Sequence, residues 1–445
     1  MVRTIIKAVV FSCILFQTAV AEEQKFSLED AVAMALDNND ALKAFENSVS
    51  ASKSDIGISR SPLLPHLGIE ESFVRTDNPT GVFSIKLNQQ RFTESDFDLS
   101  NLNNPDPVSD FQTNFTAEMP ILAVQELLKV RSYQKEYQAR SEEYDRQKEV
   151  VAFNVIKSYI NVQTAKEFVG VAEKALEDSE EQLRITKKRY ESDLGLYSDT
   201  LRASSAVTEM EQQLVSTRKN LKVAKRKLGL LMGLTESVDT DEKEIEIPLY
   251  ESGYYTENSE LRKDIKSLEL RHESAKTNVK AAEAGYIPKI GVRGNYQLND
   301  KDIPFGSEGN SWLVAGILRW ELFNGARREY ERAKAKHQSA EIGQMINGLK
   351  KEVSLQVYES LLTVEESNKN IELAESSLKS AEEGTRLVQK RYENSLSPFY
   401  DLLDAQVNLD RARANLVAKK NEYLISIAKL SFDSGTILQD IGVEY

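Results

Sequence analysis

Residues 189–203 read RYESDLGLYSDTLRA, and residues 391–405 read RYENSLSPFYDLLDA. The two stretches are offset by 202 residues, and the alignment continues without a gap to Gly233 and Gly435. Each stretch places a short run of turn-forming residues between two segments of helical composition. The sequence therefore predicts an internal twofold repeat in which each half contains a long helical hairpin.

The same offset extends upstream of the turns as two matching sets of apolar positions. Their common spacing of 4, 3, 7 and 7 residues is typical of the heptad seam of a coiled coil. The two sets are Val155, Tyr159, Val162, Val169 and Leu176, and Val357, Leu361, Val364, Ile371 and Leu378. Paired helices that follow such a seam are predicted to form a solvated bundle.

Four long helices are predicted, at about residues 124–193, 198–231, 327–394 and 398–432. The first would be roughly 105 Å long, a length that suits a supercoiled bundle and not a compact enzyme core. In the last, Ser397 is the expected cap and Pro398 the expected first helical residue. A shorter helix is predicted from about Ser27, which opens a sequence similar to a capping box, to Arg60.

Four further segments have strand character, at about residues 66–76, 110–119, 289–298 and 311–322. In the last three, apolar and polar residues alternate, as they do in a strand with two different faces. The sheet could be soluble with one buried face, or it could carry a lipid-facing band opposite a polar lumen. Lys289, Arg293, Arg319 and Glu321 share the polar face, which favours the second interpretation.

In that interpretation one row of side chains on the strands faces lipid. Its members are Phe111, Phe115, Met119, Ile290, Val292, Tyr296, Trp312, Val314, Leu318 and Trp320. Four strands are too few to close a barrel, but three symmetric copies would supply twelve.

The first 21 residues are predicted to be a secretory signal, with Arg3 and Lys7 before an apolar run and Ala19-Val20-Ala21 as cleavage site. The only cysteine, Cys13, lies in this segment.

Without the two basic residues of this segment, Arg3 and Lys7, the mature chain has 70 acidic residues and a net charge of −15. This acidic balance argues against a nucleic-acid partner. No later segment is apolar enough for a membrane-spanning helix, so a chain that crosses a membrane would need a closed barrel.

These features divide the chain into five parts. The predicted signal at residues 1–21 is followed by a first repeat at 22–233, an acidic equatorial linker at 234–258, a second repeat at 259–435 and a tail at 436–445. The fold class is mainly α, with long helical hairpins and four strands per chain.

The chain resembles the TolC-like outer-membrane efflux proteins over essentially its whole mature length. The duplicated turn is the most specific element, since the family pattern is approximately R-Y-x-x-G followed by D-x-L-x-A. The strand-to-helix junctions at Met119-Pro120 and at Asn324-Gly325 also match, and residues 81–92 are similar to the first external loop of one branch. Two departures are Ser397, which stands where the first turn has Gly195, and the missing glycine pair at the first junction.

The resemblance implies a homotrimer in the Gram-negative outer membrane. Its twelve-stranded barrel would contact outer-membrane lipid, and its α-helical barrel would cross the periplasm. It would act as the passive exit duct of a tripartite efflux or type I secretion system. Its partners would be a periplasmic adaptor and an inner-membrane transporter, and no cofactor is implied.

The two turns are the expected site of a periplasmic aperture. Asp401 and Asp404 share one helix face, Asp199 is the first-repeat counterpart of Asp401, and threefold symmetry would turn each into a ring that favours cations. Arg202 stands at the position of Asp404. Tyr190 and Tyr392 could hydrogen-bond to these acids and hold the end closed. From spacing alone, solvated acids that stabilise helix starts are an equally good interpretation, and the resemblance favours the aperture.

The tips of the same turns are the expected contact with an adaptor, because small or apolar residues gather there at an otherwise polar end. These residues are Leu194, Gly195, Leu196, Leu396, Ser397 and Pro398. Simple turn chemistry is the alternative, and both can hold together.

No catalytic or metal-binding pattern is predicted. His66, His272 and His337 lie far apart in sequence without ligand spacing. The acidic residues follow the charge pattern of helix surfaces. A structural or adaptor-type periplasmic coiled-coil protein without a pore is the alternative function, and an enzyme is a distant third.

Overall fold

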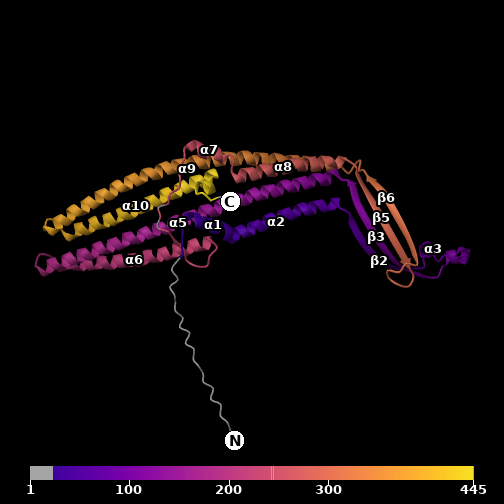
Figure 1. The fold of residues 1–445 in the computed structure, drawn as a ribbon, viewed down its shortest axis with the longest axis horizontal. Helices are drawn as coiled ribbons and strands as arrows, with labels where there is room; N and C mark the ends of the chain where they lie inside the picture. The colour runs from indigo at the N-terminus through magenta and orange to yellow at the C-terminus, as the bar shows by residue number, and fades with distance from the viewer. Residues whose placement is uncertain (1–23, 242, 244, 444–445) are drawn as a thin grey trace, which may run out of the picture.

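The computed structural model describes residues 24–241, 243 and 245–443. The predicted signal at residues 1–21 lies outside these described residues. Figure 1 shows an elongated molecule in which long helices run side by side, with a β-sheet at one end and two helical turns at the other. The sheet and the predicted aperture therefore lie at opposite ends of one chain.

The four long helices lie within a few residues of their predicted bounds. They are α5 Val124–Glu191, α6 Tyr197–Leu231, α9 Arg327–Glu393 and α10 Phe399–Ser434. α5 is joined to α6 by the first turn, and α9 to α10 by the second (Figure 1). In the described part of the chain, no helix combines the length and the apolar composition needed to cross a membrane.

The helix predicted from Ser27 to Arg60 is wrong in one respect, because it is two helices, α1 Leu28–Asn38 and α2 Asp40–Arg60. Asn39 separates them. Its side chain accepts hydrogen bonds from the backbone of Ala41 and Leu42 and so caps α2. A matching pair, α7 Ser252–Ser259 and α8 Lys263–Glu283, precedes the second half of the sheet.

The four predicted strands form one antiparallel sheet. They are β2 His66–Thr76, β3 Val108–Leu122, β5 Lys289–Asp300 and β6 Gly309–Arg319, and the order is β2-β3-β5-β6. β6 ends before Trp320, Glu321 and Leu322, which were predicted to continue it. The guanidinium of Arg328 donates hydrogen bonds to the carbonyl oxygens of Glu321 and Leu322 at 2.7 and 2.8 Å. These carbonyls therefore point toward α9 and not toward a neighbouring strand.

The remaining elements are short. They are β1 Lys25–Phe26, which pairs in parallel with β4 Asp239–Thr240, the helices α3 Pro79–Asn88, α4 Leu99–Asn103 and α11 Ile437–Asp440, and the 3₁₀ turns η1 Ser61–Leu63, η2 Glu94–Phe97 and η3 Ala284–Tyr286. α3 and α4 belong to the connection between β2 and β3 at the far end of the sheet (Figure 1).

The main hydrophobic core lies at the middle of the molecule, which we call the equator. This core contains residues of α1, α5, α6, α9 and α10. The predicted seam residues Val155, Tyr159 and Val162 are fully buried there. The hydroxyl of Tyr159 donates to the carbonyl of Phe26 at 2.9 Å and to Asp241 at 2.8 Å. Burial, together with the hydrogen bond to Asp241, raises the pKa of Tyr159.

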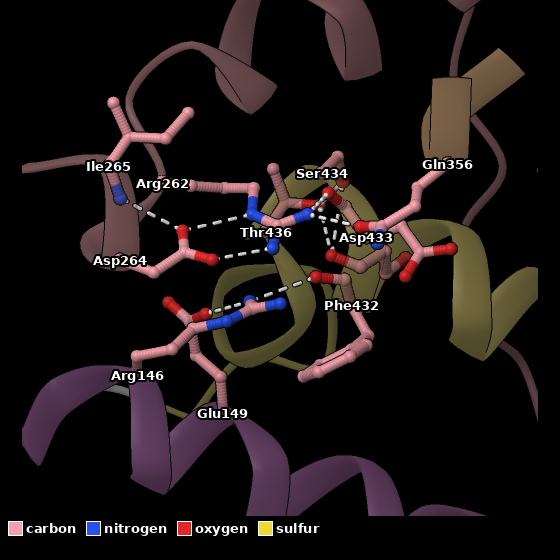
Figure 2. A network of polar contacts seen from close by, with 11 residues as sticks. Arg146, Glu149, Arg262, Asp264, Ile265, Gln356, Phe432, Asp433, Ser434 and Thr436 are labelled. Carbon is pink, nitrogen blue, oxygen red and sulfur yellow. Dashed lines mark hydrogen bonds and ion pairs between the residues drawn. The ribbon is translucent and has the colours of Figure 1, made fainter. Parts of the chain in front are cut away.

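A buried polar network at the equator fixes the end of α10 (Figure 2). The guanidinium of Arg262 donates to the Asp433 carbonyl at 2.8 Å and to Gln356 at 3.0 Å, and it forms a two-point ion pair with Asp264. Burial alone would raise the pKa of Asp264, but the hydrogen bonds and charge of Arg262 outweigh it and hold this pKa below its ordinary value. The network therefore joins α8, α9 and α10.

A second guanidinium reaches the same helix end from α5. Arg146 donates to the Phe432 carbonyl at 3.0 Å, lies 4.1 Å over the Phe432 ring and pairs with Glu149 (Figure 2). Positive charge at a helix C-terminus is favourable because the last carbonyls carry partial negative charge. In the first half, the end of α6 is bound by a neutral group, because the side-chain amide of Asn39 donates to the Leu231 carbonyl at 3.1 Å.

Replacing Arg262 by alanine should destabilise the equator strongly. The change leaves Gln356, Asp264 and the Asp433 carbonyl without their partner, and breaking a buried ion pair costs about 3 to 5 kcal/mol. We expect a lower thermal midpoint by far-UV circular dichroism and faster amide exchange at the end of α10. Arg202→Ala, at an exposed site, is the control; equal midpoints for the two variants would contradict the role of Arg262.

The ion pair of Asp264 should make stability fall in acid. Because its pKa is lowered in the folded chain, its contribution is complete above the unfolded value of about 3.9 and is lost as the pH falls through the folded value. The gap in thermal midpoint between the wild type and Asp264→Asn should therefore be constant from pH 5 to 8. It should narrow below about pH 4, and a gap that widens in acid would contradict this assignment.

Candidate functional site

The two turns have the same backbone structure. Each helix ends in a Schellman motif: the Leu194 amide donates to the Arg189 carbonyl, and the Leu396 amide donates to the Arg391 carbonyl, both at 2.8 Å. Asp193 and Ser395 occupy the left-handed position of these motifs, with φ of 57° and 60°. The turns are thus equivalent in conformation at the offset of 202 residues, although neither uses glycine at the strained position.

Arg189 holds the two turns together. One of its terminal nitrogens donates to the Glu393 carbonyl at 2.8 Å, and the other donates to the Ser395 hydroxyl at 2.8 Å and to the Leu194 carbonyl at 3.1 Å. Its guanidinium carbon also lies 4.8 Å from the centre of the Tyr392 ring. Arg189 belongs to the turn motif, but no spacing in the sequence indicated this role.

The two predicted tyrosines lie in different environments. Tyr392 is 5% exposed beneath Arg189 and packs against Phe399, whereas Tyr190 is 46% exposed and packs against Tyr197. Burial raises the pKa of Tyr392, the Arg189 charge opposes the rise, and the Asp199 charge adds to it. Within the described chain, neither hydroxyl donates to Asp199, Asp401 or Asp404, so the predicted tyrosine–aspartate bonds are not made in a single copy.

The predicted acids lie in the first turns of α6 and α10. Asp401 is exposed and accepts a hydrogen bond from Ser397 at 2.5 Å, and Asp404 accepts one from Asn408 at 3.3 Å. Asp199 is half-buried, and Arg202 is exposed one turn further along α6. The structure therefore brings Asp199 close to Tyr392 of the second hairpin and leaves Asp401, Asp404 and Arg202 open to solvent.

The tips of the turns are apolar, as predicted. Leu194, Leu196 and Leu396 are exposed. The expectation for the second helix start is wrong by one residue: Pro398 is the cap of α10, and Ser397 precedes it and bonds to Asp401. At Gly195 an added Cβ would lie 3.1 Å from the Cβ of Arg189, so glycine leaves room for the Arg189 side chain to pass.

A polar groove that sequence reasoning missed lies between α5 and the second hairpin. It encloses about 260 Å³ and is crossed by the ion pair of Arg413 with Asp178 at 2.8 Å. Asp410 lies beside it, where burial raises its pKa although Arg413 is near. The only sequence signal was the spacing of Gln406, Asp410 and Arg413 on one helix face.

The sheet places the predicted lipid-facing residues on one face. Phe115 lies opposite Tyr296, which lies opposite Trp312, so three strands share one aromatic row. Trp320 lies just beyond β6, where its indole donates to the Tyr286 carbonyl at 3.2 Å. The other face is polar and includes an ion pair between Arg293 and Glu118. Two polar pairs of β2 and β3 interrupt the apolar face: buried Thr113 donates to Glu71 at 2.5 Å, and Arg75 donates to Ser109 at 3.3 Å.

No metal centre was predicted. In the part of the chain that the structure describes, no group of three or more His, Cys, Asp or Glu side chains is placed to hold a metal ion.

Residues 31–234 and 255–436 match the protein family described as outer membrane efflux protein. Nodulation protein T of Rhizobium leguminosarum bv. trifolii is 21% identical over 297 residues, which are 63% of this chain and 62% of that protein. The probable efflux pump outer membrane protein TtgC of Pseudomonas putida is 23% identical over 291 residues, 62% of this chain and 58% of that protein. The chain thus spans about three fifths of the length of the curated relatives that it matches.

The fold is similar to that of CusC, a protein whose crystal structures concern folding and transmembrane channel formation. The TM-score is 0.80 over 95% of each chain, at 17% sequence identity. At this identity the likeness concerns the fold alone.

Replacing Arg189 by alanine should loosen both turns together. The change removes three hydrogen bonds and the contact with Tyr392, so amide exchange at residues 192–198 and 394–400 should become on the order of tenfold faster. Hydrogen–deuterium exchange read by mass spectrometry measures both segments in one experiment. Arg184→Ala, which removes an exposed arginine of the same helix, is the control. Unchanged amide exchange in Arg189→Ala would contradict the inference that Arg189 holds the two turns together.

Proposed function

Because the chain belongs to the outer membrane efflux protein family, we propose that it is the passive exit duct of a tripartite efflux or type I secretion system. The protein is located in the Gram-negative outer membrane, with a large helical part in the periplasm. The single observation that carries the proposal is the family match over both halves of the chain. The arrangement of sheet and turns at opposite ends supports it, because a duct needs a membrane end and a partner end.

The membrane end is a twelve-stranded barrel made by three copies. The sheet of one chain has two free edges, β2 and β6, within the described residues. Unpaired strand edges cannot face hydrocarbon, so the strands must close on one another. Three copies give an even strand number, and the polar face with Arg293 and Glu118 suits a water-filled lumen.

The periplasmic end is the ring of helical turns. Here Leu194, Leu196 and Leu396 are apolar and exposed, so they offer contact area to a periplasmic adaptor and, through it, to an inner-membrane transporter. With Gly195, Ser397 and Pro398 they form the proposed adaptor contact. The duct itself performs no reaction, and the inner-membrane partner supplies the energy.

The aperture is lined by carboxylates. Asp401 and Asp404 are exposed on α10, and Asp199 lies near Tyr392 between the hairpins. In a trimer these side chains form rings, and carboxylate rings favour cations. Arg202 offsets part of this charge from the first hairpin.

Single-channel conductance in planar bilayers, recorded beside the mass of the purified protein in detergent, tests this function. We expect a trimer with a small, cation-selective conductance. Asp401→Ala combined with Asp404→Ala should lower the cation preference several-fold, because it removes two of the rings. Asp199→Ala should raise the conductance. The half-buried Asp199 lies near Tyr392 between the hairpins, where we expect it to help hold the aperture closed.

Glu257→Ala is the matched control, since Glu257 is an exposed acid on α7, away from both ends of the molecule (Figure 1). A monomer that carries no current would refute the duct. A trimer whose selectivity is the same in all variants would refute the aperture alone.

A further inference from the structure

A hollow lies on the apolar face of the sheet. It encloses about 520 Å³, and small-molecule sites in proteins usually enclose about 300 to 1,000 Å³. The strand register explains its shape, because one row of this face runs across the four strands as Leu67, Ala117, Gly294 and Val314. Two small residues therefore lie side by side between two large ones, and the gap above them is the hollow.

An aromatic wall closes the hollow on the side away from the long helices. Phe115, Tyr296 and Trp312 form the next row of the same face, two residues further along each strand. Leu67 and Trp312 are 82% and 76% exposed, so no other part of the described chain covers them. A continuous exposed apolar surface of this kind marks contact with lipid or with another molecule.

The backbone does not require glycine at position 294, in the floor of the hollow. A Cβ added to Gly294 would meet no atom closer than 4.0 Å, and its φ lies outside the left-handed region. Glycine inside a strand weakens the sheet, because it has no side chain to pack and loses more backbone entropy on folding. Such a glycine often marks a place where a ligand approaches the backbone. Gly294 thus keeps the hollow open at a cost in stability.

We propose that this hollow binds one acyl chain of a membrane lipid. The residues that line it carry no charge, and its walls are hydrocarbon and aromatic rings. An empty hollow in a bilayer leaves its lining without contact atoms, whereas a chain that lies in it gains dispersion contacts on several sides. The proposal rests on the membrane barrel of the proposed function, because only there does this face meet lipid.

The surroundings of the hollow set the direction of the bound lipid. Beyond the aromatic wall the same face becomes polar, at Glu71 with Thr113 and at Arg75 with Ser109. Tryptophan and tyrosine gather where the hydrocarbon of a membrane gives way to its headgroups. A lipid whose chain lies in the hollow therefore has its polar end on the side of Arg75, at the end of the sheet away from the helices.

The two tryptophans of the chain provide the measurement. Trp312 lines the hollow, and Trp320 lies beyond β6 with its indole bound to the Tyr286 carbonyl. In a Trp320→Phe variant, Trp312 is the only tryptophan. Phosphatidylethanolamine with brominated acyl chains, added to this protein in detergent, should quench Trp312 several-fold more than its mole fraction predicts, and the quenching should saturate. In Trp312→Phe, the quenching of Trp320 should follow the mole fraction.

Filling the hollow should abolish the excess quenching. In the Trp320→Phe background, Gly294→Leu places a side chain in the hollow, and Ala117→Leu does the same from β3. Gly316→Leu is the matched control, because Gly316 lies on the same face of β6, a Cβ there would meet no atom within 4 Å, and the residue does not line the hollow. Both filling variants should lower Trp312 quenching to the value that the mole fraction predicts, and the control should keep the excess.

The outcomes separate the acyl-chain site from the proposed duct. Quenching of Trp312 that follows the mole fraction in the Trp320→Phe protein overturns the site and leaves the duct standing. An excess that survives both Gly294→Leu and Ala117→Leu overturns it as well. If brominated lipid does not quench Trp312 at any mole fraction, protein and not lipid covers this face, and the lipid-facing assignment of the sheet falls together with the site.

Discussion

The carbonyl groups at the end of α10 are bound by two buried arginines, and this attachment links α10 to α5, α8 and α9. Arg146 approaches from α5 and Arg262 from the start of α8, so one helix end connects both halves of the chain. The sheet lies on one side of the attachment and the turns on the other (Figure 1). The attachment reinforces the contacts that α5 also makes with α8 and with α10.

Much of this architecture could be read from the sequence. Heptad spacing predicted the long helices, and alternation predicted which strand residues share a face, because both patterns are local consequences of backbone geometry. The break at Asn39 and the end of β6 at Arg319 were missed. Each depends on one side chain that competes for backbone groups, Asn39 itself in the first case and Arg328 in the second.

The residues of the candidate site were also predicted from the sequence only in part. Asp199, Asp401 and the two tyrosines were identified because they recur in the duplicated turn, and Asp404 was identified because it shares one helix face with Asp401. Arg189 recurs there too, yet its role depends on the second turn lying beside the first, which sequence spacing does not encode. The ion pair of Asp178 with Arg413 joins residues 235 positions apart and was invisible for the same reason.

The length of the hairpins makes the position of the turns sensitive to the packing at the equator. α6 has 35 residues and is therefore about 52 Å long, and it extends from the core to the tip without a break. Each degree of rotation at the equator moves the tip by roughly 0.9 Å over that length. A rotation of a few degrees at the equator would thus displace the turns by several ångströms.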